Sequence, residues 1–102
     1  MRVIKPATVR EWMCRHPRAK AGLEWWLDAV RSGGWTQLAE LRMTFPAADL
    51  VRVASGRNVV VFNISGNAFR LIAAMHFNSG HVYTLAFMTH AEYSKNRWKD
   101  QL

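Results

Sequence analysis

The hydrophobic period of this sequence changes at Pro46, and that change limits the folds open to it. Before Pro46, Leu23, Trp26, Leu27 and Val30 recur at the i, i+3, i+4, i+7 spacing of an amphipathic helix. After it, apolar runs follow one another with short Gly, Asn and Ser turns between them, which is typical of antiparallel neighbours. We therefore expect an α+β fold in which N-terminal helices pack on one face of a small twisted antiparallel sheet.

Three helices are expected in the first half. Thr8 opens a Thr-x-x-Glu capping box, which predicts that the first helix starts there, and Pro17 should end it. The amphipathic second helix should end at Gly33-Gly34. Thr36 is expected to cap a third, shorter helix that Pro46 closes.

Five strands are expected, one at the N-terminus and four after Pro46. Their ranges are Arg2 to Ile4, Leu50 to Val53, Asn58 to Ile64, Ala68 to Phe77 and His81 to Met88. In the strand from Ala68, period-two alternation puts Phe69 and Leu71 on one face and Arg70 on the other. The chain has 102 residues, so we expect a single domain over 1–102.

Composition restricts the compartment and the partners. Fourteen Lys and Arg against seven Asp and Glu give a net charge of +7, which favours a polyanionic partner such as RNA, DNA or an acidic protein. The alternative is that this charge only keeps the domain soluble. A single cysteine, Cys14, excludes a disulfide framework, and no signal peptide or bilayer-length apolar stretch is seen. A cytoplasmic location is expected, with Cys14 as a packing residue and most aromatic rings in the core.

Two side chains in the second half could carry chemistry. Arg70 would stand on a strand as a rigid guanidinium, which can contact two phosphate oxygens and stabilise a pentavalent transition state. The alternative is an exposed residue paired with a carboxylate. His90 follows the last strand, and imidazole accepts and donates protons near neutrality, although an ordinary surface histidine would look the same. His16, His76 and His81 form no metal-binding spacing.

Two sequence segments carry a resemblance. Val61 to Leu71 reads Val-Phe-Asn-Ile-Ser-Gly-Asn-Ala-Phe-Arg-Leu, and Met88 to Tyr93 reads Met-Thr-His-Ala-Glu-Tyr. Their order and spacing resemble the HigB family of bacterial toxins, whose signature is V-F-N-hydrophobic-G-G-N-x-x-R followed by T-H-x-E-Y-D. The resemblance implies a RelE-like fold and ribosome-dependent cleavage of messenger RNA without a metal or small-molecule cofactor. It also implies a partner antitoxin of the HigA type, a helix-turn-helix protein.

The resemblance also assigns roles to residues. His90 would be the general acid or base, Arg70 would stabilise the scissile phosphate, and Tyr93 would position or protonate an oxygen. Asn67 would hold the RNA backbone, and Glu92 would be structural. The remaining RNA contacts are hypothesised from charge and are Arg10, Arg15 and Arg18.

Two positions depart from the family pattern. Ser65 replaces the first glycine of the G-G-N turn, and Ser94 stands where the family places aspartate. The Ser94 departure supports a second hypothesis, that the chain is a catalytically weak or inactive basic domain that binds RNA or protein. A third hypothesis is a gyrase poison of the ParE type, which shares the superfamily fold, although the T-H-x-E-Y ending better resembles the RNA-cleaving branch.

Overall fold

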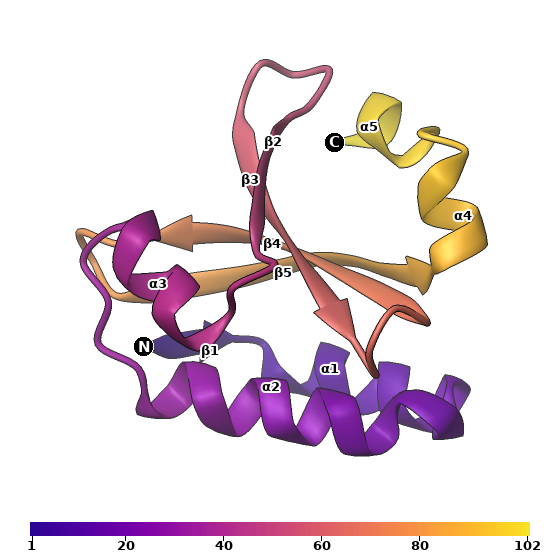
Figure 1. Ribbon diagram of the computed structural model, residues 1–102, viewed down its shortest axis with the longest axis horizontal. Coiled ribbons are helices and arrows are strands. Elements are labelled where there is room, and N and C mark those ends of the chain that lie inside the picture. The colour runs from indigo at the N-terminus through magenta and orange to yellow at the C-terminus, as the bar shows by residue number, and fades with distance from the viewer.

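The computed structural model describes residues 1–102 and contains one sheet with helices at both ends of the chain (Figure 1). In chain order the elements are β1 (Arg2–Ile4), α1 (Pro6–Arg15), the short 3-10 helix η1 (Pro17–Ala19), α2 (Lys20–Ser32), α3 (Leu38–Thr44), β2 (Asp49–Arg52), β3 (Asn58–Ile64), β4 (Phe69–His76), β5 (His81–Thr89), α4 (His90–Ser94) and α5 (Trp98–Gln101). The five expected strands and three expected N-terminal helices are therefore present, with ends that coincide or differ by one or two residues. The two C-terminal helices were not expected.

The strands lie in the order β1-β5-β4-β3-β2. The four strands from β2 to β5 are antiparallel neighbours, as the tight turns predicted. The N-terminal strand β1 is the exception because it pairs with β5 in parallel, so the open sheet is mixed. A parallel neighbour needs a long crossover, and here the chain between β1 and β5 contains the N-terminal helices and the strands β2 to β4.

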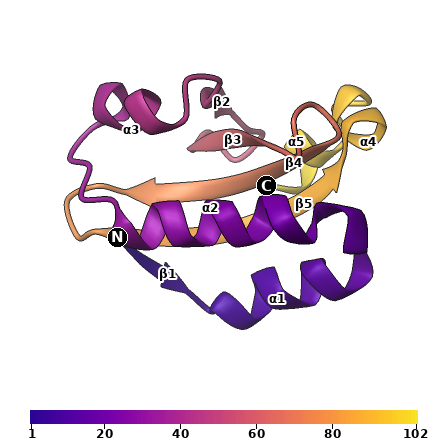
Figure 2. The same ribbon diagram turned by 60° about the horizontal axis from the view of Figure 1, so that its bottom comes forward.

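Helices α1 and α2 cover one face of the sheet, as expected (Figure 2). The apolar side of α2 is buried against that face through Leu23, Trp26, Leu27 and Val30. Burying each such side chain contributes about 1.5–3 kcal/mol, so this face anchors the helical layer. A smaller apolar cluster lies on the other face, and Trp98 from α5 belongs to it. No helix combines the length and the apolar character needed to cross a membrane.

Two predicted helix starts are wrong. Helix α1 begins at Pro6 and not at Thr8, because proline at the first helical position has a preset φ and no N–H to leave unsatisfied. Helix α3 has Gln37 at its N-cap, and the hydroxyl of Thr36 instead donates a hydrogen bond to the Glu40 carboxylate.

One prediction about burial is wrong, and two aromatic rings on the helices are less buried than the rest of the core. Cys14 is exposed and not a packing residue. Trp25 is 57% exposed, although its ring packs edge-on against Phe45. Trp12 is only half-buried and stacks on Phe87. All three residues lie on α1 or α2.

A β-bulge determines on which face of the sheet the last side chains of β5 lie. Ile72 pairs with Ala86 and Ala73 pairs with Thr84, so Leu85 has no partner on β4. Simple alternation from Val82 would put Met88 on the helical face. Because of the extra residue, Met88 packs on the opposite face, in the cluster that contains Trp98.

The turn between β3 and β4 contains a strained serine. Ser65 has φ 54°, in the left-handed region that favours glycine. The turn also lies close to α2, since a Cβ added at Gly22 would come within 2.6 Å of the Ser65 hydroxyl oxygen. The serine that departs from the family pattern thus adopts a glycine-like backbone conformation.

We expect Ser65→Gly to raise the free energy of unfolding by about 1 kcal/mol, because a left-handed conformation costs an L-residue roughly that much. Urea denaturation should show a higher midpoint with an unchanged slope. Gly66→Ala is the matched control: Gly66 has φ 67° and nothing within 4 Å of an added Cβ, so backbone strain alone should lower stability. A lower midpoint for Ser65→Gly would contradict the strain argument.

Candidate active site

Arg70 is the centre of a hydrogen-bonded cluster built from both resemblance segments. Its Nη1 donates to the backbone carbonyls of Asn67 (3.1 Å) and Phe69 (3.0 Å). Its Nη2 donates to Oδ1 of Asn67 at 2.5 Å and lies 2.9 Å from Nδ1 of His90. The β3–β4 turn belongs to the first segment, and the start of α4 belongs to the second. The two segments therefore meet at the guanidinium of Arg70.

The Arg70 side chain is buried without a counter-ion. It is 7% exposed and is the only charged residue in the buried set. The ion pairs of the chain are Arg15–Glu11 and Lys20–Glu24, so no carboxylate lies within 4 Å of Arg70. Buried charges are normally paired, and this one is held only by neutral acceptors. The expected alternative of a strand arginine paired with an acid is thus wrong.

The hydrogen bonds also determine which atoms of the cluster remain available. A guanidinium has no acceptor, so Nδ1 of His90 must accept from Arg70 and the ring hydrogen resides on Nε2. The terminal nitrogens of Arg70 are fully engaged, while its Nε–H has no partner within the protein. Oδ1 of Asn67 accepts from Arg70, which leaves the Asn67 amide NH₂ free to donate.

The first residue of α4 is fixed by its backbone. The His90 N–H donates to the Ala68 carbonyl at 2.9 Å, which ties α4 to the β3–β4 turn. Thr89 and Glu92 form a capping box at the start of α4, the arrangement wrongly predicted at Thr8. Hydrogen bonds from the backbone N–H and then the hydroxyl of Thr89 lower the pKa of the Glu92 carboxyl. Glu92 therefore has the structural role that the sequence suggested.

Tyr93 packs over Arg70, with the guanidinium carbon 5.3 Å from its ring centroid. Burial raises the pKa of the Tyr93 phenol, and the nearby Asp49 carboxylate raises it further, while the positive charge of Arg70 opposes them. The phenol therefore stays protonated at neutral pH and is a hydrogen-bond donor. Asp49 has no hydrogen bond in the cluster but acts on it through its charge.

The other residues singled out from the sequence lie outside this cluster. Arg10, Arg15 and Arg18 are exposed on α1 and η1, and Arg15 pairs with Glu11 at 2.5 Å. The Ser94 hydroxyl donates to the His90 carbonyl at 2.9 Å, so the position that departs from aspartate contacts backbone. No group of three or more His, Cys, Asp or Glu could hold a metal ion.

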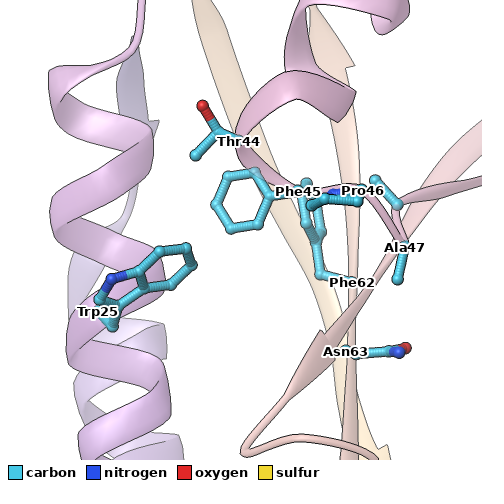
Figure 3. Close-up of a pocket in the computed structure, with 8 residues that line it drawn as sticks. Trp25, Thr44, Phe45, Pro46, Ala47, Phe62 and Asn63 are labelled. Carbon is cyan, nitrogen blue, oxygen red and sulfur yellow. The ribbon is translucent and has the colours of Figure 1, made fainter.

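A separate hollow of about 170 Å³ lies between α2 and the loop after α3 (Figure 3). Its lining residues are mainly apolar and none ionises near neutral pH: Trp25, Thr44, Phe45, Pro46, Ala47, Ala48, Phe62 and Asn63. Without an acid, base or cation, this hollow cannot supply proton transfer or charge stabilisation. The Arg70 cluster, which brings a buried cation, an imidazole and a phenol together, is the candidate active site.

Comparison with known families now gives the class of the protein. Residues 19–96 match a family model described as HigB toxin, the RelE-like toxic component of a toxin-antitoxin system. The match covers α2 through α4 and includes every member of the Arg70 cluster. The chain therefore belongs to the HigB family of RelE-like toxins.

Curated relatives agree over most of the length. The chain is 27% identical over 93 residues to the mRNA interferase toxin HigB of Escherichia coli K12, which covers 91% of this chain and 88% of the relative. The same values hold for proteins named mRNA interferase HigB from Escherichia coli O157:H7 and Shigella flexneri.

The raised pKa of Tyr93 can be measured directly, because the chain has two tyrosines and Tyr83→Phe leaves Tyr93 alone. We expect its phenol carbon, followed by NMR, to titrate above the ordinary value of about 10. Adding Asp49→Asn should lower the pKa of Tyr93, since it removes a negative charge that disfavours phenolate. An unchanged midpoint in Asp49→Asn would mean that burial alone causes the shift.

Proposed function

We propose that this HigB-family chain is an endoribonuclease that cleaves messenger RNA on the ribosome and is neutralised by a HigA-type antitoxin. The observation that carries the proposal is the buried Arg70 guanidinium, which has no counter-ion and is hydrogen-bonded to His90. A buried cation without a counter-ion attracts an anionic ligand, and the neighbouring imidazole of His90 can transfer protons. The names of the relatives supply the substrate class.

Each group of the cluster has a role in cleavage by the RNA 2′-hydroxyl. The basic nitrogen of the resting His90 ring is Nδ1, which Arg70 occupies. A scissile phosphate that draws the guanidinium toward its oxygens frees Nδ1 to take up a proton, while Nε2 hydrogen-bonds the substrate. The 2′-oxygen attacks phosphorus as its proton passes to Nδ1, and the bond between phosphorus and the 5′-oxygen breaks. The protonated Tyr93 phenol donates its proton to that leaving oxygen, and the free amide NH₂ of Asn67 holds a phosphate oxygen. This chemistry uses side chains alone, without a metal or small-molecule cofactor.

The basic surface supports the proposed partners. A net charge of +7 draws the chain toward the ribosome and toward the acidic surface of an antitoxin. Arg10 and Arg18 are exposed and outside any ion pair, so they are free to follow RNA phosphates, whereas Arg15 is partly neutralised by Glu11. Co-expression with the antitoxin should restore growth and yield a stable complex.

We expect His90→Ala and Arg70→Ala each to abolish growth arrest when the chain is expressed in bacteria. Loss of a general acid or base typically lowers the rate by about 10²–10⁴-fold, which would also remove new 5′ ends from cellular messages. The exposed residues His76 and Arg52 lie outside the cluster, so His76→Ala and Arg52→Ala are matched controls that should arrest growth like wild type.

Full toxicity in both cluster variants, with folding confirmed by circular dichroism, would overturn the assignment. Growth arrest by wild type without new 5′ ends, but with loss of gyrase supercoiling, would instead identify a ParE-type activity. Cleavage of naked RNA at the rate seen during translation would show that the ribosome is not required.

Salt dependence tests the proposed RNA-binding role of the N-terminal arginines. In Arg10→Ala/Arg18→Ala, ribosome binding should weaken, and the slope of log affinity against log salt should become shallower by about 0.7 for each phosphate that is no longer neutralised. Arg52→Ala/Arg57→Ala removes the same charge from exposed positions around the β2–β3 turn and controls for net charge. Equal changes in the two double variants would contradict a specific RNA-binding role for the arginines of α1 and η1.

A further inference from the structure

Trp98 lies beyond the stretch that matches the family, which ends at residue 96, yet it touches the candidate active site. Its indole ring stacks on the Tyr93 ring with centroids 5.2 Å apart and planes 18° apart. Its Nε1–H donates to the backbone carbonyl of Tyr93 at 3.1 Å. One side chain therefore holds both the ring and the backbone of Tyr93.

Trp98 is itself firmly held. It is 5% exposed and packs in the apolar cluster on the face opposite α1 and α2, with neighbours from β3, β4 and β5 such as Val59, Ile72 and Met88. The next residue along α5, Lys99, accepts a hydrogen bond at its carbonyl from the Ala54 N–H at 2.9 Å. The four-residue helix α5 is thus anchored to the sheet and to the β2–β3 turn.

A line of contacts consequently runs from the sheet to the reacting groups. Trp98 contacts Tyr93, Tyr93 lies over the guanidinium of Arg70, and Arg70 donates to His90. Arg70 has no counter-ion, so the face of the Tyr93 ring is one of the few favourable surroundings of its charge. A tyrosine displaced from this position would stop covering Arg70 and would admit water to it.

We propose that Trp98 is a positioning residue of the site, which holds Tyr93 over Arg70 and so fixes the geometry of the Arg70–His90 pair. This rests on the proposed function, because it assigns Trp98 a part in the same cleavage reaction. Trp98 does not meet the RNA in this scheme and acts only through Tyr93. Two substitutions separate its contacts: Trp98→Phe keeps a stacking ring without the indole N–H, and Trp98→Leu removes both while keeping an apolar side chain.

The first readout needs no RNA. In the Tyr83→Phe background, Trp98→Leu should shift the NMR signals of the Tyr93 ring, because the ring current of the indole disappears. It should also lower the pKa of Tyr93 toward its ordinary value, because water reaches the phenol. Trp98→Phe should keep most of the pKa elevation. Unchanged Tyr93 signals and an unchanged titration in folded Trp98→Leu would overturn the proposal whether or not the chain cleaves RNA.

The second readout is cleavage of a translated message. For Trp98→Leu we expect kcat to fall about 10- to 100-fold, the effect of displacing a catalytic group by about 1 Å, with KM nearly unchanged. Trp98→Phe should restore most of kcat. Trp26→Leu is the matched control, since Trp26 is buried in the helix-side cluster without contact to Tyr93, and it should lower stability with little effect on kcat of the folded protein.

The outcomes distinguish the two proposals. If wild type cleaves no RNA while Trp98→Leu still shifts Tyr93, the proposed function fails and the stacking of the two rings stands. If wild type cleaves and folded Trp98→Leu has the same kcat, the positioning role fails alone. Equal losses of kcat in Trp98→Leu and Trp26→Leu would reduce Trp98 to a general contribution to stability and would also overturn the proposal.

Discussion

The structure depends on the way one buried positive charge is accommodated. Arg70 lies on β4, and its guanidinium contacts backbone carbonyls, an amide oxygen, an imidazole and the face of an aromatic ring. Those neutral groups compensate the loss of water but leave the full charge in place. The protein therefore maintains an unneutralised cation in a low-dielectric position, where its effect on a nearby anion is greater than in water. The β3–β4 turn and α4 are arranged around this guanidinium, and α5 reaches it only through Tyr93.

Much of this could be predicted from the sequence because the relevant signals are local. Alternation in β4 correctly separated Phe69 and Leu71 from Arg70, and the two faces belong to separate apolar clusters. The strands and turns were also predictable, since apolar runs and Gly-containing turns specify antiparallel pairing. The proximity of Arg70 and His90 is different. The resemblance assigned both residues to one reaction, but no contact between them was predicted, because twenty residues separate them and no local pattern reports a contact across β4 and β5.

Features that depend on competition between local signals were missed. A Thr-x-x-Glu pattern occurs at both Thr8 and Thr89, but at the first site Pro6 starts the helix earlier. The bulge at Leu85 could not be predicted from hydrophobicity, because the residues of β5 suit the two faces of the sheet with or without the extra residue. Trp98 gave no signal as a site residue, since a lone tryptophan near a chain end suggests only core packing. In each of these cases the local sequence permits structures of similar energy, and tertiary contacts determine which one forms.

Ser65 and Ser94, the two residues that depart from the family pattern, make different contacts and have different consequences. Ser65 affects the backbone of the turn that presents Asn67, so its cost is conformational strain at φ 54°. Ser94 bonds the His90 carbonyl within α4 and leaves the Arg70 hydrogen bonds intact. An aspartate there would bring a negative charge to the helix that carries His90 and Tyr93. Serine instead adds no further negative charge to a cluster on which the Asp49 carboxylate already acts, so the attraction of Arg70 for an incoming phosphate is not weakened further. The absence of aspartate is therefore compatible with the proposed chemistry, because the charge that matters in this site is the one that remains unpaired.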